Sequence, residues 1–287
     1  PLIDRYGADA VRYWAANGRL GMDMAYDESV FKIGGKLVTK LYNAGKFVLS
    51  QAGGSGDITE ELDKSFIAQL KQKTVRAKEL FENYEFASAL QITEDFFWEG
   101  FTDNYIELVK NRSKDLSNPV GMVSAIGSLR LGLSVMLRLF APFLPTVTDE
   151  IWSWVFAEET GYSSIHMAPW PEGIIRIEKD QMVENLKTEI NLPSFHRIGC
   201  VNPPVFEGSF SAACDAIGAV RKAKSELGIS LGKPLLSLTL LTNVQGKSDL
   251  ELVVNDVSAA SGAPNIVLDI NGVMRESRYE AIALPAP

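Results

Sequence analysis

The stretch VFKIGGKLVTKLYNAGKFVLS, residues 30–50, decides the fold that the sequence predicts. Four of its apolar residues follow one another at intervals of four, three and four: Leu37, Leu41, Ala44 and Val48. Because an α-helix turns once in about 3.6 residues, this spacing places them on one face of a helix. Asp27 precedes the stretch as a favourable N-cap residue, with Glu28 beside it in the first turn. We therefore expect a helix with one buried face.

The same helical periodicity continues through most of residues 4–157. It predicts helices over residues 4–17, 30–50, 63–83, 86–111, 122–140 and 146–156. Pro142 and Pro145 separate the last two, because a proline inside a helix removes a hydrogen-bond donor and clashes with the preceding turn. Helices in this number, joined by short connections, indicate an antiparallel helix bundle.

The chain changes character towards its second half. Residues 164–171 contain Pro169 and Pro171, so they cannot continue a helix and are expected to lie as a strap across the bundle. Residues 173–208 are interpreted as a linker, with one helix at about 180–189. In the remainder, helices alternate with β-type runs: helices at 211–227 and 249–260, and strands at 235–241, 265–270 and 279–284. The predicted fold class is mainly α, an antiparallel helix bundle followed by a small α/β C-terminal domain over residues 209–287.

Composition excludes several classes of protein. At 287 residues and 46% hydrophobic content, the chain is long enough for roughly two soluble domains. The most apolar stretch, residues 131–147, is interrupted by Arg138 and two prolines and falls short of the roughly 18 uncharged residues of a membrane span. Two cysteines, Cys200 and Cys214, without metal-ligand spacing indicate neither a disulfide framework nor a zinc site, and fit a reducing cytoplasm.

The charge balance limits where nucleic acid could bind. A net charge of −8 is unfavourable for phosphate contacts, which need clustered lysine and arginine. Residues 1–50, however, carry seven basic against five acidic side chains, so this end is mildly basic. Any nucleic-acid face must therefore be local.

One helix face is a candidate for such a site. Lys36, Lys40, Asn43 and Phe47 recur at intervals of four, three and four, beside the stripe that we expect to be buried. Ammonium groups contact phosphates or base acceptors, an amide reads a base edge, and a ring stacks on an unpaired base. The alternative is a solvated helix face with one more core aromatic residue.

Other polar groups are weaker candidates. Asp103 and Glu107 share one helix face and might form an acid/base pair, but we interpret them as solvated surface carboxylates. His166 is expected to be a packed histidine bonded to the backbone. The run Arg221-Lys222-Ala223-Lys224 is either a phosphate contact or a soluble helix face. The apolar stripe on the opposite side of this helix from Asp103 and Glu107 is expected to lie in the core: Trp98, Phe101, Tyr105 and Leu108.

Six segments, in order and at matching spacing, resemble the C-terminal half of class I aminoacyl-tRNA synthetases of the valine type. They are Ile3 to Gly18, Gly18 to Asp27, Lys40 to Ala44 with Phe47, Trp98 to Glu107, Ala141 to Trp152, and Ser164 to Pro171. The resemblance covers residues 1 to about 172, and the stretch 219–226 is a weaker match to the C-terminal region of that family.

The resemblance implies what this chain does and lacks. The family's Lys-Met-Ser-Lys-Ser and His-x-Gly-His signatures do not occur, so the chain is expected to be a catalytically inert piece of a longer protein. The whole enzyme would join valine to its tRNA with ATP, which would bind in a missing catalytic domain; no cofactor or metal site is expected in this piece. Its implied partners are valine tRNA and the missing catalytic and editing domains, and neither a membrane nor DNA.

The resemblance also assigns roles to residues. Lys40, Asn43 and Phe47 would face the anticodon, with Phe47 stacked on a base and Lys40 and Asn43 bonded to base edges, and Lys36 is added to the site from its spacing on the same helix face. Ile106 and Glu107, on the opposite helix, would shape the pocket that rejects other anticodons. Residues 1–25 would form a segment that contacts the tRNA stem, and residues 26–172 the anticodon-binding bundle with its strap.

Two alternatives stay open. The chain could be the same region of an isoleucyl or leucyl enzyme, although its Gly18-Arg19-Leu20-Gly21 and Ser164 to Pro171 segments favour the valine type. It could instead be a helical protein-interaction module without an RNA role, which the acidic charge favours. A small-molecule enzyme is the least favoured, because no polar constellation supports one.

Overall fold

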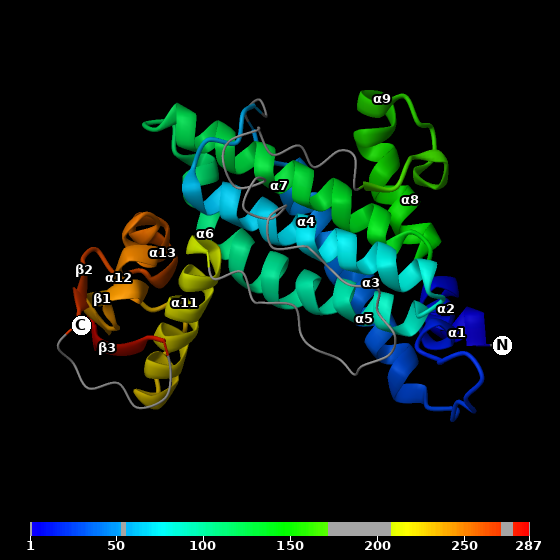
Figure 1. Ribbon diagram of the computed structural model, residues 1–287, viewed down its shortest axis with the longest axis horizontal. Helices are drawn as coiled ribbons and strands as arrows, with labels where there is room; N and C mark the ends of the chain where they lie inside the picture. Colours follow the sequence, from blue (N-terminus) through cyan, green and yellow to red (C-terminus); the bar gives the residue numbers. More distant parts are fainter. Residues whose placement is uncertain (1, 53–55, 172–207, 271–277, 287) are drawn as a thin grey trace, which may run out of the picture.

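A computed structural model describes residues 2–52, 56–171, 208–270 and 278–286 (Figure 1). The predicted linker, residues 173–208, and its helix at about 180–189 lie almost entirely outside the described residues.

The first part of the chain is a helix bundle, which confirms the predicted fold class (Figure 1). Its elements, in order, are α1 (Leu2–Tyr6), α2 (Ala8–Ala16), α3 (Glu28–Leu49), α4 (Glu61–Glu82), α5 (Phe86–Asp95), the π-helix η1 (Phe96–Tyr105), α6 (Ile106–Val109), the 3₁₀-helix η2 (Arg112–Lys114), α7 (Pro119–Phe140), α8 (Pro145–Trp154), α9 (Phe156–Thr160) and the 3₁₀-helix η3 (Ile165–Met167).

Helix α3 begins and packs as its sequence predicts. The Asp27 carboxylate caps it by accepting a hydrogen bond from the Ser29 backbone N–H at 2.8 Å. The predicted stripe is fully buried: Leu37, Leu41, Ala44 and Val48. Local periodicity alone therefore determines which face of α3 turns inward.

Two long helices that the sequence predicted are divided in the structure. Residues 4–17 are not one helix, because Gly7 adopts a φ of +85°, which interrupts the helical backbone between α1 and α2. Residues 86–111 are not one α-helix either: α5 passes into the ten-residue π-helix η1, then into α6. In a π-helix the backbone bonds join residue i to i+5, so side chains five apart come to the same side.

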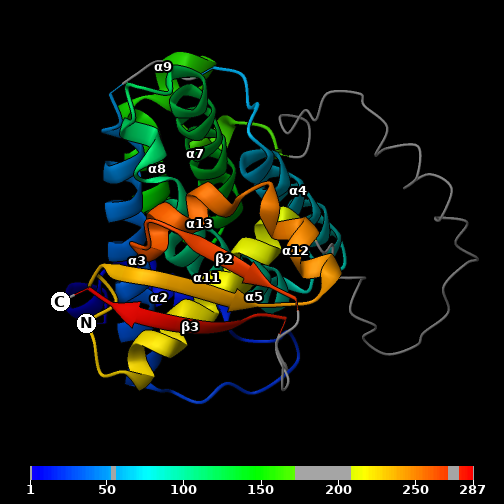
Figure 2. The ribbon, with the colours of Figure 1, turned by 90° about the vertical axis from the view of Figure 1, so that its left-hand side faces the viewer.

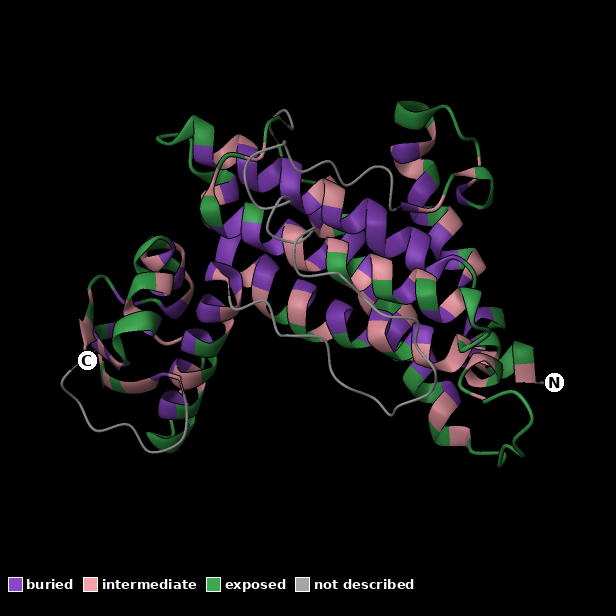
Figure 3. Cartoon of the chain, viewed as in Figure 1, coloured by how far each residue is buried: buried purple, intermediate pink, exposed green. Residues whose placement is uncertain are grey.

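Helix α7 is the centre of the bundle. By length and composition it could cross a membrane, but 72% of its apolar window is buried inside the structure. Figure 3 shows this buried surface running along α7 between its neighbours. The helix is therefore interpreted as the core helix of the bundle.

The strap follows the prediction in part. Ile165 is buried, and the Asp149 carboxylate accepts hydrogen bonds from the Ser164 hydroxyl at 2.7 Å and from the Ile165 N–H at 2.9 Å. The Trp170 ring packs edge-on against Phe81, with ring centroids 5.3 Å apart. His166 was expected to be packed and is exposed, although its Nε2 does lie 3.2 Å from the Pro145 carbonyl oxygen.

The C-terminal unit has the predicted α/β character. It comprises α11 (Ser209–Glu226), β1 (Leu235–Leu241), α12 (Val244–Glu251), α13 (Val254–Ser261), β2 (Ile266–Asp269) and β3 (Glu280–Pro285). The sheet order is β2-β1-β3, with β1 parallel to β2 and antiparallel to β3. The helix predicted at 249–260 is two helices, α12 and α13.

The C-terminal unit packs directly on the bundle. Helix α11 lies between the sheet and the bundle in both views (Figures 1 and 2). The Phe210 ring packs edge-on against Phe66, with centroids 5.4 Å apart, and its backbone N–H donates to the Ser65 hydroxyl at 3.0 Å. The Arg112 Nε donates to the Asp256 carboxylate at 2.8 Å. One hydrophobic core therefore continues from the bundle into the C-terminal unit.

Candidate nucleic-acid interface

The predicted polar face of α3 lies beside its buried stripe. Lys36 and Asn43 are exposed, while Lys40 and Phe47 are half-buried. Gly45 lies on another side of α3, where a Cβ atom would come within 2.8 Å of Ile151 on α8. Helix α8 therefore covers that side of α3, while the polar face contacts η1 at Lys40 and η2 at Phe47.

Lys40 is held by two groups on η1. Its Nζ lies 3.1 Å from the Asp103 carboxylate and 5.1 Å from the centroid of the Trp98 ring. The Lys40 and Asp103 side chains are 37% and 52% exposed, so the ion pair contributes only about 0.2–1 kcal/mol to folding. Because an ammonium has three N–H donors, a ligand can still bind to Lys40.

The π-helix explains why Trp98 and Asp103 meet at one lysine. They are five residues apart, so α-helical winding would place them on different faces, whereas π-helical winding brings them to the same side. α-Helical periodicity predicts Trp98 and Asp103 on opposite sides of the helix, and this prediction is wrong because residues 96–105 form a π-helix. No feature of the sequence that we identified predicts the π-helix.

Trp98 is itself fixed from behind by a buried carboxylate. Glu94 accepts hydrogen bonds from the Trp98 indole N–H at 3.2 Å and from the Tyr13 hydroxyl at 2.7 Å. Burial raises the pKa of Glu94, although these two hydrogen bonds oppose the shift. These hydrogen bonds connect Tyr13 on α2, through Glu94, to the Trp98 ring that faces Lys40.

Phe47 lies at the C-terminal end of the same face. Its ring is half-buried, and the Lys114 Nζ lies 5.7 Å from its centroid. The Gln51 side chain donates to the Phe47 carbonyl at 2.8 Å and accepts from the Ser113 hydroxyl at 3.1 Å. These hydrogen bonds connect the end of α3 to η2 and keep the Lys114 ammonium close to the Phe47 ring.

Ile106 and Glu107 lie on α6, with different surroundings. Ile106 is buried in the core, with 9% of its surface exposed. Glu107 is half-buried and forms an ion pair with Lys110. Asp103 and Glu107 are solvated, as expected, with side chains 52% and 46% exposed, and each is also paired with a lysine. Among the described residues, Lys36 and Lys114 have no carboxylate partner.

A second charged cluster lies on the other side of η1 and was not predicted. Arg112 donates to both oxygens of the Asp63 carboxylate, at 2.7 and 2.8 Å, and to Asp256. Asp63 also accepts from the Tyr105 hydroxyl at 2.8 Å and from the Ser124 hydroxyl at 2.6 Å. Asp63 is fully buried and every one of these groups has a partner. We call this group the Asp63 cluster.

The basic run on α11 is not a phosphate site as a whole. Arg221 donates to the Asn104 side chain at 2.8 Å and to the Asp103 carbonyl oxygen. Lys224 is 2% exposed, and its ammonium donates to three carbonyl oxygens, those of Leu231, Lys233 and Ser261. The phosphate interpretation is therefore wrong for Lys224, whose donors stabilise the C-terminal unit. Of this run, Lys222 is exposed.

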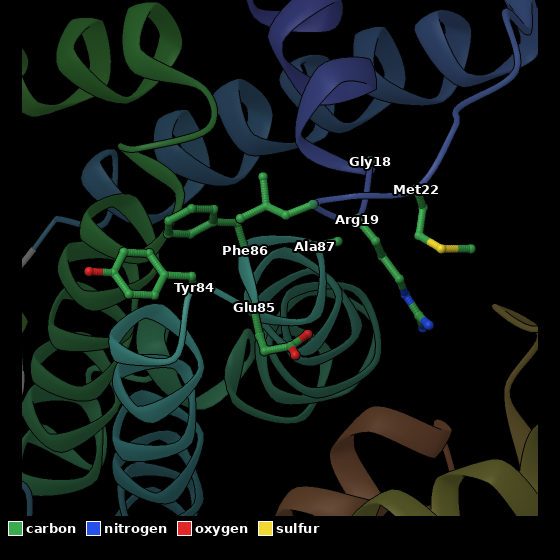
Figure 4. Close-up of a pocket in the computed structure, with 8 residues that line it drawn as sticks. Gly18, Arg19, Met22, Tyr84, Glu85, Phe86 and Ala87 are labelled. Carbon is green, nitrogen blue, oxygen red and sulfur yellow. The ribbon is translucent and has the colours of Figure 1, made fainter.

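The opening segment borders a separate cavity. A hollow of about 200 Å³ lies between residues 18–22 and the turn that joins α4 to α5. Figure 4 shows Arg19 and Met22 on one side and Tyr84, Glu85 and Phe86 on the other. Within the described residues, no group of three or more His, Cys, Asp or Glu side chains is placed to hold a metal ion.

Comparisons with known proteins point in one direction. The family model described as the anticodon-binding domain of tRNA ligase matches residues 63–240. The valine--tRNA ligase of Bifidobacterium longum subsp. infantis is 35% identical over 287 aligned residues, covering 90% of this chain and 28% of that protein. The valine--tRNA ligase of Wolbachia pipientis wMel is 41% identical over 200 residues, covering 67% of this chain and 22% of that protein.

The chain thus spans between a fifth and a third of the length of these relatives. Among solved structures, one chain of the LeuRS-tRNA-LeuAMS ternary complex of Agrobacterium radiobacter has a TM-score of 0.42 and 19% identity to it. That similarity covers 67% of this chain and 26% of the other.

Proposed function

This chain belongs to the anticodon-binding domain family of tRNA ligases, and we propose that its function is to bind the anticodon arm of a tRNA. The observation that carries the proposal is the polar face of α3. There Lys36, Lys40 and Asn43 lie in line with the half-buried Phe47 ring, beside η1 at Lys40 and η2 at Phe47. Cations with free donors can contact the phosphate or base edge of an unpaired nucleotide, and an aromatic ring can stack on its base.

The charge of this face is positive, although the net charge of the chain is negative. Asp103, the carboxylate that contacts this face, is paired with Lys40, and Glu107 on α6 is paired with Lys110. Lys36 and Lys114, which have no carboxylate partner among the described residues, add positive charge at either end. A phosphate that approaches the face therefore meets net positive charge, in spite of the overall −8.

We further propose that the tRNA is the valine acceptor, because the relatives at 35% and 41% identity are valine--tRNA ligases. In the whole protein, other domains would join valine to the tRNA with ATP and edit errors, in the cytoplasm. The part described here would recognise the tRNA without a catalytic role. Phe47 would stack on an anticodon base, Lys36, Lys40 and Asn43 would bond to phosphates or base edges, and Ile106 and Glu107 would shape the pocket opposite.

The test is a binding comparison between anticodon arms. A stem-loop with a valine anticodon should bind the chain, and its affinity should fall steeply as salt is added, because phosphate contacts release counterions. The same stem-loop with an isoleucine or a leucine anticodon should bind more weakly. Equal binding of all three would contradict valine recognition, and no binding of any would contradict the RNA role and favour a protein-interaction module.

A substitution locates the site within the chain. Phe47→Ala should weaken binding of the valine stem-loop by about 1–3 kcal/mol, which is the usual effect of removing a stacked ring. Phe81→Ala is the matched control, because Phe81 is also half-buried at the edge of the core but belongs to α4 and packs against Trp170 of the strap. An unchanged affinity in a folded Phe47→Ala variant would remove this ring from the interface.

A further inference from the structure

The C-terminal unit touches η1 at the residue that holds Lys40. The two Arg221 Nη groups of α11 bond to the Asn104 side chain at 2.8 Å and to the Asp103 carbonyl oxygen. The Asp103 carboxylate, on the other side of the same residue, accepts from Lys40 at 3.1 Å. A continuous line of contacts therefore runs from the C-terminal unit through η1 to the polar face of α3.

These contacts depend on the π-helical winding of η1. Lys40 meets Trp98 and Asp103 together because π-helical winding aligns residues five apart. A local return to α-helical winding would turn Asp103 away from Trp98 and separate the two groups around the ammonium. π-Helices are rare, and this one persists because its surroundings hold it. Near its C-terminal end, Asp63 holds Tyr105 on the buried side, and Arg221 holds Asp103 and Asn104 on the exposed side.

We propose that Arg221 is a positioning residue for RNA recognition: the C-terminal unit sets the affinity of the α3 face by holding Asp103, and through it Lys40, without touching the anticodon. The inference rests on the proposed function of that face. Arg221 suits the role because its planar guanidinium donates to two acceptors in a fixed geometry, which a lysine cannot reproduce. Its adjacent residue Lys222 is exposed on the same helix and provides a matched charge control.

The experiment measures binding of the valine stem-loop by wild type, Arg221→Gln and Lys222→Gln, each over a range of salt. Arg221→Gln should weaken binding about 2- to 8-fold, within the range of couplings carried through contact networks and no more than the loss expected on removing Lys40 itself. In the Lys40→Met background, Arg221→Gln should not change the salt dependence further, whereas a separate phosphate contact of Arg221 itself would lower the slope by about 1 more. Lys222→Gln should bind within about twofold of wild type. Equal losses in both variants, or a further decrease of the slope when Arg221→Gln is added to Lys40→Met, would overturn the proposal.

A double-substitution cycle identifies the residue through which Arg221 acts. In a Lys40→Met background, Arg221→Gln should have little further effect on affinity, because the group that it positions is already absent. An undiminished loss in that background would show that Arg221 acts elsewhere. Arg221→Lys, which keeps the charge, should recover only part of the affinity if geometry is what matters, and full recovery would contradict a positioning role.

Hydrogen exchange tests the same claim without RNA. Amides of residues 96–106 should exchange faster in Arg221→Gln than in wild type and Lys222→Gln, and unchanged exchange would overturn the hold of Arg221 on η1. Failure of the proposed function has a different signature, because wild type itself would then bind no stem-loop. If wild type discriminates between anticodons while Arg221→Gln equals Lys222→Gln, the function stands and this inference fails.

Discussion

Two charged groups lie on opposite sides of η1, and they differ in almost every physical respect. In the Asp63 cluster the carboxylate is fully buried, and it accepts hydrogen bonds from Arg112, Tyr105 and Ser124. At the α3 face, Lys40 and Asp103 are paired in water, with side chains 37% and 52% exposed. The first group has no capacity left for a ligand, whereas the second keeps free donors.

Because of this difference, we expect the Asp63 cluster to contribute to the stability of the fold and the Lys40–Asp103 pair to contribute to ligand recognition. A buried charge that loses its partner remains in a medium of low polarity, so breaking such a pair is costly. An exposed pair loses little when it is broken, because water solvates both groups. The Asp63 cluster therefore joins α4, η2, α7 and α13, while the Lys40 pair is suited to exchange contacts with a ligand.

The largest expected effect is on the Asp63 cluster. Arg112→Met should lower the free energy of unfolding by about 3–5 kcal/mol, because it leaves Asp63 and Asp256 without their cation. Urea denaturation monitored by circular dichroism measures the change. Arg76→Gln is the control, since Arg76 forms an exposed ion pair with Glu79 on α4. Similar losses in both variants would remove the distinction between the two kinds of charge.

A smaller effect is expected from one hydroxyl of the same cluster. Tyr105→Phe removes the donor that bonds to Asp63 and should cost about 1.5–3 kcal/mol, as for hydrogen bonds to charged groups. Tyr279→Phe should cost only about 0.5–1.5 kcal/mol, because the hydroxyl of this buried tyrosine donates to a neutral carbonyl, that of Gly246. Equal costs, measured by denaturation, would mean that the charge of Asp63 adds nothing.

The exposed pair should behave in the opposite way. Lys40→Met should change the free energy of unfolding by less than about 1 kcal/mol, yet weaken binding of the valine stem-loop about three- to eightfold near 0.1 M salt if the ammonium contacts a phosphate. Lys247→Met removes a comparable exposed ion pair, with Glu251 on α12, and should leave binding unchanged. A large loss of stability with unchanged binding would reverse the roles of the two regions.

Glu94 is a third case. It is buried like Asp63, but the hydrogen bonds that it accepts come from the neutral side chains of Trp98 and Tyr13. Burial raises its pKa in the folded chain, so the folded state binds a proton that the unfolded state has released. The contribution of Glu94 to stability is therefore most favourable below the ordinary glutamate pKa of about 4.3 and declines as pH rises through the raised value.

The check is a pair of stability curves against pH. Between pH 4 and pH 7, the stability of wild type relative to Glu94→Gln should decrease, a small effect that denaturation at each pH can measure. Glu99→Gln, at an exposed position on η1, controls for the general loss of one carboxylate. A difference that stays constant or increases with pH would show that hydrogen bonding outweighs burial at Glu94.

Local patterns predicted much of this molecule. The buried stripe of α3, its Asp27 cap and the strand at residues 235–241 were found from spacing and residue type, because each depends on neighbours within a few positions. The exposure of Lys36 and Asn43 follows from the same helical geometry. Their roles, and those of Lys40, Phe47, Ile106 and Glu107 in RNA binding, remain predictions.

What was missed depends on residues far apart in the chain. Asp63 was interpreted as the start of a helix, but its partner Arg112 lies 49 positions away and makes its burial possible. Lys224 looked like a surface lysine, but three carbonyl groups of the folded C-terminal unit surround its ammonium. The π-helix η1 has no sequence signal that we recognised.

The sequence by itself determined the helical fold class, the inward face of α3 and the line of polar residues beside it, because helix periodicity is a property of the chain over a few turns. The tertiary structure alone decided which charges are buried, which lysines keep free donors, and that Arg221 reaches Asp103. The physical reason is that the strength of a charged contact depends on how much water remains around it, and only packing between distant segments removes that water.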